Sequence, residues 1–158
     1  MQDIFLDNRV VIVFLHVISA VVWVGGMIVM RYAAHQSFAE IESPEKRLER
    51  MAHALKRLFI IVFPFVIILI VTAVFMLLGY DIKNTEYRSL AHAKEGIWTV
   101  MFIALIVMIL RRNKGAKLLA AGDTLGAKAQ LEVIGKYMVP LNIILGVVAI
   151  FLGTSFFK

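Results

Sequence analysis

The sequence predicts an all-α integral membrane protein, a bundle of four transmembrane helices that forms one domain over residues 1–158. Three observations support this prediction. Apolar residues make up 61% of the chain and the mean hydropathy is +0.85, whereas soluble domains contain roughly 45–50% apolar residues. Four stretches approach the roughly 20 apolar residues that cross a hydrocarbon core. Basic residues gather in the stretches between them.

The predicted spans are about 10–31, 58–79, 91–110 and 137–157. The third span is short, because its strongly apolar part has only 14 residues, 97–110, which is about 21 Å of helix. We therefore expect this helix to begin near Ala91. That start places His92, Lys94 and Glu95 at the outer boundary of the membrane.

The distribution of Lys and Arg predicts the orientation. Twelve basic residues fall on the side that holds the two long loops, and five fall on the other side. Because basic residues favour the cytoplasmic side, we expect both termini outside, in the periplasm, and helices that extend into the cytoplasm. This topology indicates a multi-pass membrane protein, which we expect in a bacterial inner membrane. The same residues explain the net charge of +6 by contacts with anionic lipid, without a nucleic-acid partner.

Local signals mark the helix ends in the loops. Ser43-Pro44 predicts an N-cap and a first-turn proline for a helix that continues from Glu45 into the second span. Gly122-Asp123-Thr124 predicts a turn between a helix that ends near Ala120 and one that begins near Leu125. Long helices therefore project beyond the membrane.

The first span contains an ionisable residue, His16, about 9 Å below its outer end. Such a residue is costly in a membrane and is a candidate functional residue by default. Trp23 follows after nearly two helical turns, so it faces the same way, with the small residues Ser19 and Ala20 beside it. A planar apolar cofactor needs this combination. The alternative interpretation is a His16 that hydrogen-bonds to a neighbouring helix, with small residues that allow close helix packing.

His92 is expected near the same outer side as His16. Two imidazoles from different helices can hold haem b through both axial positions, and the absence of cysteine makes such a haem non-covalent. His16 and His92 are thus the predicted metal ligands, with Trp23 against the macrocycle and Lys94 and Arg9 at the propionates. The alternative for Lys94 is a snorkelling side chain at a solvated helix start.

The eight methionines keep copper open as an alternative cofactor, because thioether sulfur favours Cu(I). Met27 and Met30 lie three residues apart in the first span, and Met101 and Met108 share a face of the third. Methionine is also ordinary core filler, so copper transport or resistance is the alternative function.

Five other residues also carry predictions. Pro64 and Pro140 predict kinks, and Asn142 is expected to join helices within the fourth span. His35 is expected to be solvated among loop charges, as is His53.

Residues 16–27 resemble the first-span motif of the copper-resistance D family, a His followed by Trp and Gly-Gly. The wider pattern resembles the J-type protoporphyrinogen IX oxidase family of four-helix haem-binding membrane proteins. The matching positions are His16, Trp23, Arg31, Pro64, His92, Lys94 and Pro140. The resemblance implies a haem b site and protoporphyrinogen oxidase activity, and it assigns no catalytic residue. The chain departs from that family at Met30-Arg31, where the family has Pro-Arg, and at Met138-Val139, where it has Asn-Glu.

The predicted function is a haem-b-binding redox protein that transfers electrons or acts as an oxidoreductase on a porphyrin-like substrate. A quinone or another redox partner stays open, and so does self-association. A third interpretation is a cofactor-free subunit whose long cytoplasmic helices bind a partner.

Overall fold

The computed structural model describes residues 2–80 and 88–154, with side chains from Phe5 onward. Every regular element in these ranges is helical. The elements are α1 (Gln2–Val29), η1 (Met30–Ala34), α2 (His35–Ala39), α3 (Pro44–Gly79), α4 (Arg88–Ala120), α5 (Thr124–Val133), η3 (Ile134–Met138) and α6 (Val139–Thr154). Because η1 and η3 are π-helical segments within longer rods, the elements make four rods.

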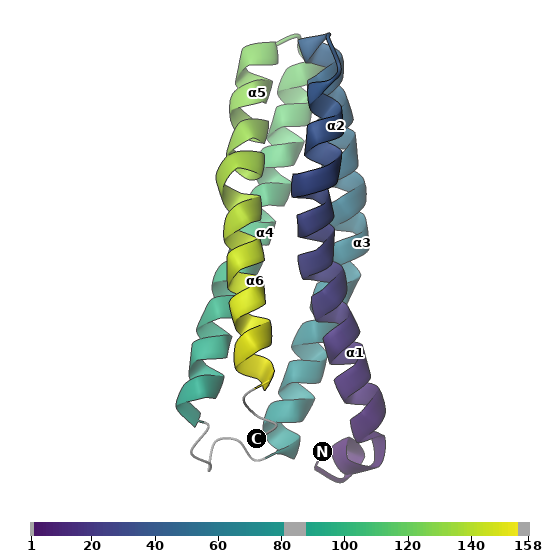
Figure 1. The fold of residues 1–158 in the computed structure, drawn as a ribbon, viewed down its shortest axis with the longest axis vertical. Helices are drawn as coiled ribbons and strands as arrows, with labels where there is room; N and C mark the ends of the chain where they lie inside the picture. Colours follow the sequence, from purple (N-terminus) through teal and green to yellow (C-terminus); the bar gives the residue numbers. More distant parts are fainter. Residues whose placement is uncertain (1, 81–87, 155–158) are drawn as a thin grey trace.

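Each of the four rods is long and apolar enough to cross a membrane. The predicted all-α, four-helix membrane architecture is therefore confirmed, and the helices extend beyond the predicted spans. Residues 155–157 of the fourth predicted span lie outside the described residues. The rods run side by side, and the two described chain ends lie at the same end of the bundle (Figure 1). We call this the terminal end and the opposite one the turn end.

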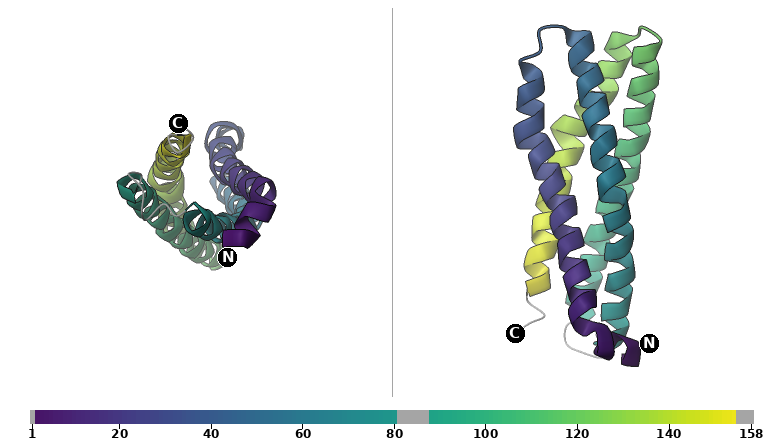
Figure 2. Two further views of the ribbon diagram at one scale, coloured as in Figure 1. Left: turned by 90° about the horizontal axis from the view of Figure 1, so that it is seen from below. Right: turned by 90° about the vertical axis from the view of Figure 1, so that its right-hand side faces the viewer.

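The rods spread apart toward the terminal end. Here the first turns of α4 and of α1 lie on opposite sides of the bundle (Figures 1 and 2). The most extensive packing between rods is that of α1 on α3.

The turn end has the capping that the sequence predicts. Ser43 is the N-cap of α3, and its Oγ accepts a hydrogen bond from the Lys46 N–H at 3.4 Å, with Pro44 in the first turn. Gly122 has a φ of +81°, a left-handed conformation that glycine adopts without strain. Asp123 then caps α5, because its Oδ1 accepts from the Gly126 N–H at 2.8 Å.

The two prolines within helices are accommodated in different ways. α3 continues through Pro64 as one helix. Pro140 is the second residue of α6 and follows η3 directly, where the Val139 N–H donates to the Ile134 carbonyl. A proline lacks an N–H and its ring crowds the preceding turn. The wider π-helical turn before Pro140 relieves this crowding.

The interior is an apolar core shared by all four rods. Its fully buried members include Met27, Val62, Leu105, Met108 and Leu131. Many other large apolar side chains are exposed along the rods, as lipid-facing surfaces require. Met101 also lies in this core and Met30 packs against it, so all four methionines considered for copper pack against apolar neighbours.

Two glycines provide a matched test of helix packing. A Cβ at Gly146 of α6 would lie 2.5 Å from Cγ2 of Val24 and 3.3 Å from Cε of Met101, whereas a Cβ at Gly25 meets nothing within 4 Å. Val24 is β-branched and stiff, so it cannot move aside easily. We expect Gly146→Ala to lower the free energy of unfolding by about 1–3 kcal/mol.

The measurement is thermal or denaturant unfolding in detergent micelles. Gly25→Ala is the control, because it adds the same methyl group to a helix with space for it. Equal stability of the two variants would contradict a close approach of α6 to α1.

Candidate functional site

His16 contacts the neighbouring helix through one ring nitrogen. Its Nδ1 lies 3.0 Å from Oγ1 of Thr72 in α3. The Thr72 side chain is buried, with 4% exposure, and the His16 ring is partly buried. The predicted alternative of a hydrogen bond to a neighbouring helix is thus confirmed, and it involves only one of the two ring nitrogens.

The direction of this hydrogen bond follows from the partners of Thr72. Its hydroxyl donates to the backbone carbonyl of Ile68 at 2.7 Å, with that of Leu69 at 3.0 Å. Since the single hydroxyl hydrogen is used there, Oγ1 can only accept from His16. This assigns the proton to Nδ1 and leaves a lone pair on Nε2. A neutral imidazole with one nitrogen held in this way is an oriented metal ligand.

The interior face of α1 continues from His16 as the sequence predicts. Ser19 is fully buried and Trp23 is 2% exposed. The Ser19 hydroxyl donates to the Leu15 carbonyl at 2.6 Å. The Trp23 Nε1–H is buried and has no hydrogen-bond acceptor among the described residues. An unpaired buried donor is costly, so this indole N–H is available to a polar group of a ligand or to water.

Lys94 lies on the interior side of α4. Its Nζ lies 3.2 Å from the point where a Cβ of Gly153 in α6 would be. Its positive charge is close enough to act on the His16 ring. Lys94 therefore lies partly buried between α4 and α6, on the side of the bundle that holds His16. Both interpretations of Lys94, a snorkelling side chain and a contact of a haem propionate, stay predictions.

The His92 side chain lies at the exposed surface of α4. Its ring is 58% exposed, and Nδ1 lies 3.0 Å from Oε2 of Glu95, one turn further along α4. His92 and Lys94 are two residues apart, which is roughly 200° of rotation around a helix, so they cannot face the same neighbour. In the described residues the structure brings Lys94, and not His92, toward His16. The role of His92 as second axial ligand stays a prediction.

Arg9 contacts an aromatic ring at the terminal end of the bundle. Its guanidinium carbon lies 5.6 Å from the centroid of the Tyr80 ring, a cation–π distance. Phe5 packs edge-on against the same ring at 4.8 Å. The contact of Arg9 therefore joins the start of α1 to the end of α3. Its predicted role at a haem propionate stays a prediction.

Two expectations about polar residues are corrected. Asn142 does not join helices, because its Nδ2 donates to the Met138 carbonyl of its own helix at 3.3 Å, and its buried Oδ1 has no partner in the described chain. His53 is exposed as predicted, but His35 is half-buried and lines a cavity. A π-helical segment at 30–34 precedes His35. No pattern in the sequence predicted this segment.

Thr72 is the site residue that sequence reasoning missed. A threonine in an apolar span usually bonds to its own helix, so it gave no separate signal. No group of three or more His, Cys, Asp or Glu side chains gathers within the part of the chain that the structure describes.

The chain matches no known protein family, no curated protein and no solved structure. The fold defines its class, a multi-pass membrane protein built from four long apolar helices. Within that class, the site is an oriented imidazole on α1 with a lysine of α4 nearby.

Proposed function

We propose that this protein binds haem b non-covalently within the bundle and serves as a redox protein of a bacterial inner membrane. His16 is the axial ligand in this proposal. Both termini face the periplasm, and the turn end faces the cytoplasm. The orientation rests on the excess of basic residues in the two long loops.

The hydrogen bond between His16 Nδ1 and Thr72 Oγ1 is the observation that supports the proposal most. It orients the ring and leaves the Nε2 lone pair for iron. Haem-bound histidines depend on such a partner for tautomer and basicity.

The other residues near His16 fit the same group. Lys94 supplies a cation for a carboxylate, and the propionates of haem b are carboxylates. Trp23 offers an apolar ring surface and an indole N–H without an acceptor among the described side chains. When bound, haem supplies an iron that takes up and releases one electron. The chain contributes orientation of the ligand, charge for the propionates and exclusion of water.

The experiment is an absorption spectrum of the detergent-purified protein, with and without dithionite, combined with iron and copper analysis. We expect a Soret band that shifts on reduction, and about one iron per chain or fewer if loading is incomplete. A colourless protein from haem-replete cells would overturn the proposal. Copper without iron would support the alternative of copper transport instead.

Protoporphyrinogen oxidase activity is a more specific proposal than a general redox function. It is supported only by the resemblance at His16, Trp23 and Lys94. The activity assay is oxidation of protoporphyrinogen by haem-loaded protein, with heat-inactivated protein as the control. A haem-loaded protein without this activity would leave electron transfer as the function.

A further inference from the structure

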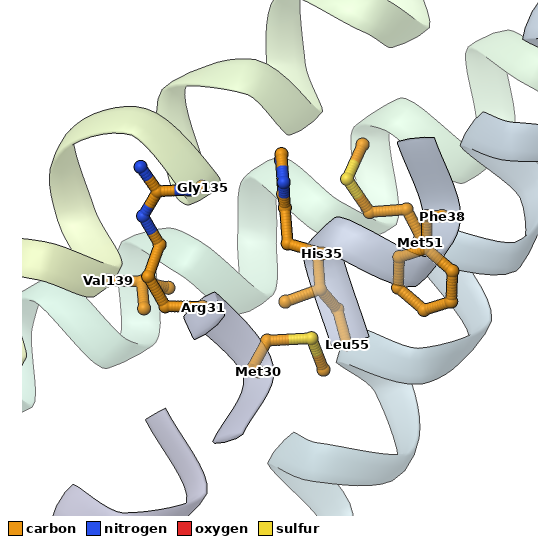
Figure 3. Close-up of a pocket in the computed structure, with 8 residues that line it drawn as sticks. All are labelled: Met30, Arg31, His35, Phe38, Met51, Leu55, Gly135 and Val139. Atoms are coloured by element: carbon orange, nitrogen blue, oxygen red, sulfur yellow. The ribbon is translucent and has the colours of Figure 1, made fainter. Parts of the chain in front are cut away.

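A second group of polar side chains lies near the turn end, about 20 Å along α1 from His16, as the rise of a helix implies. Here a small cavity lies between η1 and α2 on one side and η3 on the other. Figure 3 shows Arg31 and His35 directed toward the segment that holds Gly135. Met51 and Leu55 of α3 close the apolar side.

Arg31 differs from the other half-buried arginines of the described chain. Arg47 donates to the Ile41 carbonyl at 2.6 and 3.0 Å. Arg111 donates to Gln130 at 3.1 Å and Arg112 to the Ala52 carbonyl at 2.9 Å. Arg31 is half-buried like these three, yet no hydrogen bond or ion pair joins it to any described residue, and the same holds for His35.

The π-helical segments create this arrangement. In η1 the His35 N–H donates to the Met30 carbonyl, five residues back, which widens the turn and redirects the side chains that follow. Such π-helical turns occur frequently at functional sites. On the facing segment, Gly135 lies beside the His35 ring, since a Cβ there would be in ordinary van der Waals contact with it, 3.4 Å from Cδ2 and 3.5 Å from Nε2.

The chemistry of the Arg31 and His35 side chains favours an anion as the ligand. A guanidinium offers a planar fork of donors that matches phosphate and carboxylate oxygens, and an imidazole N–H adds another donor. The cavity has a volume of about 10 Å³, room for about one water-sized group. Its lining is almost wholly apolar, so an anion bound by Arg31 and His35 lies at the edge of the cavity and not inside it.

The surroundings of Arg31 and His35 favour a lipid headgroup as the source of this anion. Val29 and Tyr32, on either side of Arg31 along the chain, are each 61% exposed, as side chains in contact with acyl chains and headgroups are. Lys136 of η3 adds a cation, with Nζ 5.3 Å from the centroid of the exposed Tyr137 ring. Basic pockets between helices at a membrane surface bind anionic headgroups.

We propose that Arg31 and His35 form a phosphate-binding site between η1 and η3, and that a membrane phospholipid supplies the phosphate. The site does not depend on the haem proposal, because it shares no residue with it. It would fix the depth of α1 in the membrane and join the first rod to the fourth through the bound lipid.

The test compares thermal unfolding of the purified full chain in neutral detergent with added phosphatidylglycerol, diacylglycerol or inorganic phosphate. We expect phosphatidylglycerol to raise the midpoint by roughly 5 °C and diacylglycerol, which lacks phosphate, to leave it unchanged. Inorganic phosphate is expected to give a smaller rise, because it has no acyl chains. An equal rise with inorganic phosphate would overturn the lipid as the source, and no rise with either would overturn the site.

Matched variants locate the effect. Arg31→Gln with His35→Gln is expected to lose the rise, while Arg50→Gln with His53→Gln, the same change at exposed positions, retains it. Equal rises in both double variants would overturn the assignment to Arg31 and His35. Gly135→Leu tests the geometry without removing a charge, because its side chain must displace the His35 ring. A full rise in folded Gly135→Leu would also count against the site.

Discussion

His16→Ala is expected to abolish the Soret band of the purified protein. The structure gives His16 an oriented, partly buried ring with an available Nε2, whereas His92, which has a similar partner in Glu95, is exposed. Without this ligand, non-covalent haem has only apolar contacts and charges to hold it. The measurement is the ratio of Soret to protein absorbance after purification from haem-replete cells.

Two further histidine variants make this result specific. His53→Ala, at an exposed position of α3, is expected to keep the full Soret band. His92→Ala separates two arrangements: if His92 is the second ligand, the band remains and the haem changes from six- to five-coordinate. An unchanged His92→Ala spectrum would exclude His92 as a ligand, and a normal Soret band in folded His16→Ala would exclude haem binding at His16.

The fold could be predicted largely from the sequence, because membrane helices leave few alternatives. A backbone in lipid must satisfy its own hydrogen bonds, so four apolar stretches indicate four helices. The capping residues Ser43 and Asp123 then mark where two of the helices begin, since their side chains satisfy free N–H groups at those ends. The π-helical segments could not be predicted, because their cost is balanced by packing between rods distant in sequence.

The candidate site was harder to predict because it depends on helix rotation. Trp23 follows His16 by seven residues on one helix, so their shared face follows from periodicity alone, and Trp23 is indeed buried. Lys94 and His92 were assigned to the same ligand although they are two residues apart. Only the packing of α4 decides which of them faces inward, and the structure places Lys94 there.

Two of the three buried side-chain polar atoms that lack a partner among the described residues lie on α1 and α6, and the third is the Tyr80 hydroxyl at the end of α3. Val24 packs against Gly146, so α1 and α6 approach each other closely beside Trp23. The buried Trp23 donor and the buried Asn142 acceptor lie on these two helices, and neither has a partner among the described residues. Unsatisfied polar groups are costly inside a membrane. Their presence in the same bundle as His16 is consistent with an interior that is completed by a ligand or by water.

Thr72→Val is expected to weaken haem binding by about 10–100-fold without removing it, which is the usual effect of losing the partner of a metal-bound histidine. Valine keeps the shape of threonine, but it cannot accept the hydrogen bond from His16 Nδ1. The ring is then free to rotate and to change its tautomer. The measurement is the rate at which haem leaves the protein for an excess of apomyoglobin.

Thr72→Ser is the control for this prediction, because it keeps the hydroxyl and should restore slow haem loss. A purely structural role for Thr72 would lower the unfolding midpoint of the haem-free protein in Thr72→Val and leave the rate of haem loss unchanged. The hydrogen bond would instead change that rate and the reduction potential, because it adjusts the basicity of the ligand. Equal rates in the valine and serine variants would therefore show that Thr72 does not orient His16 for iron.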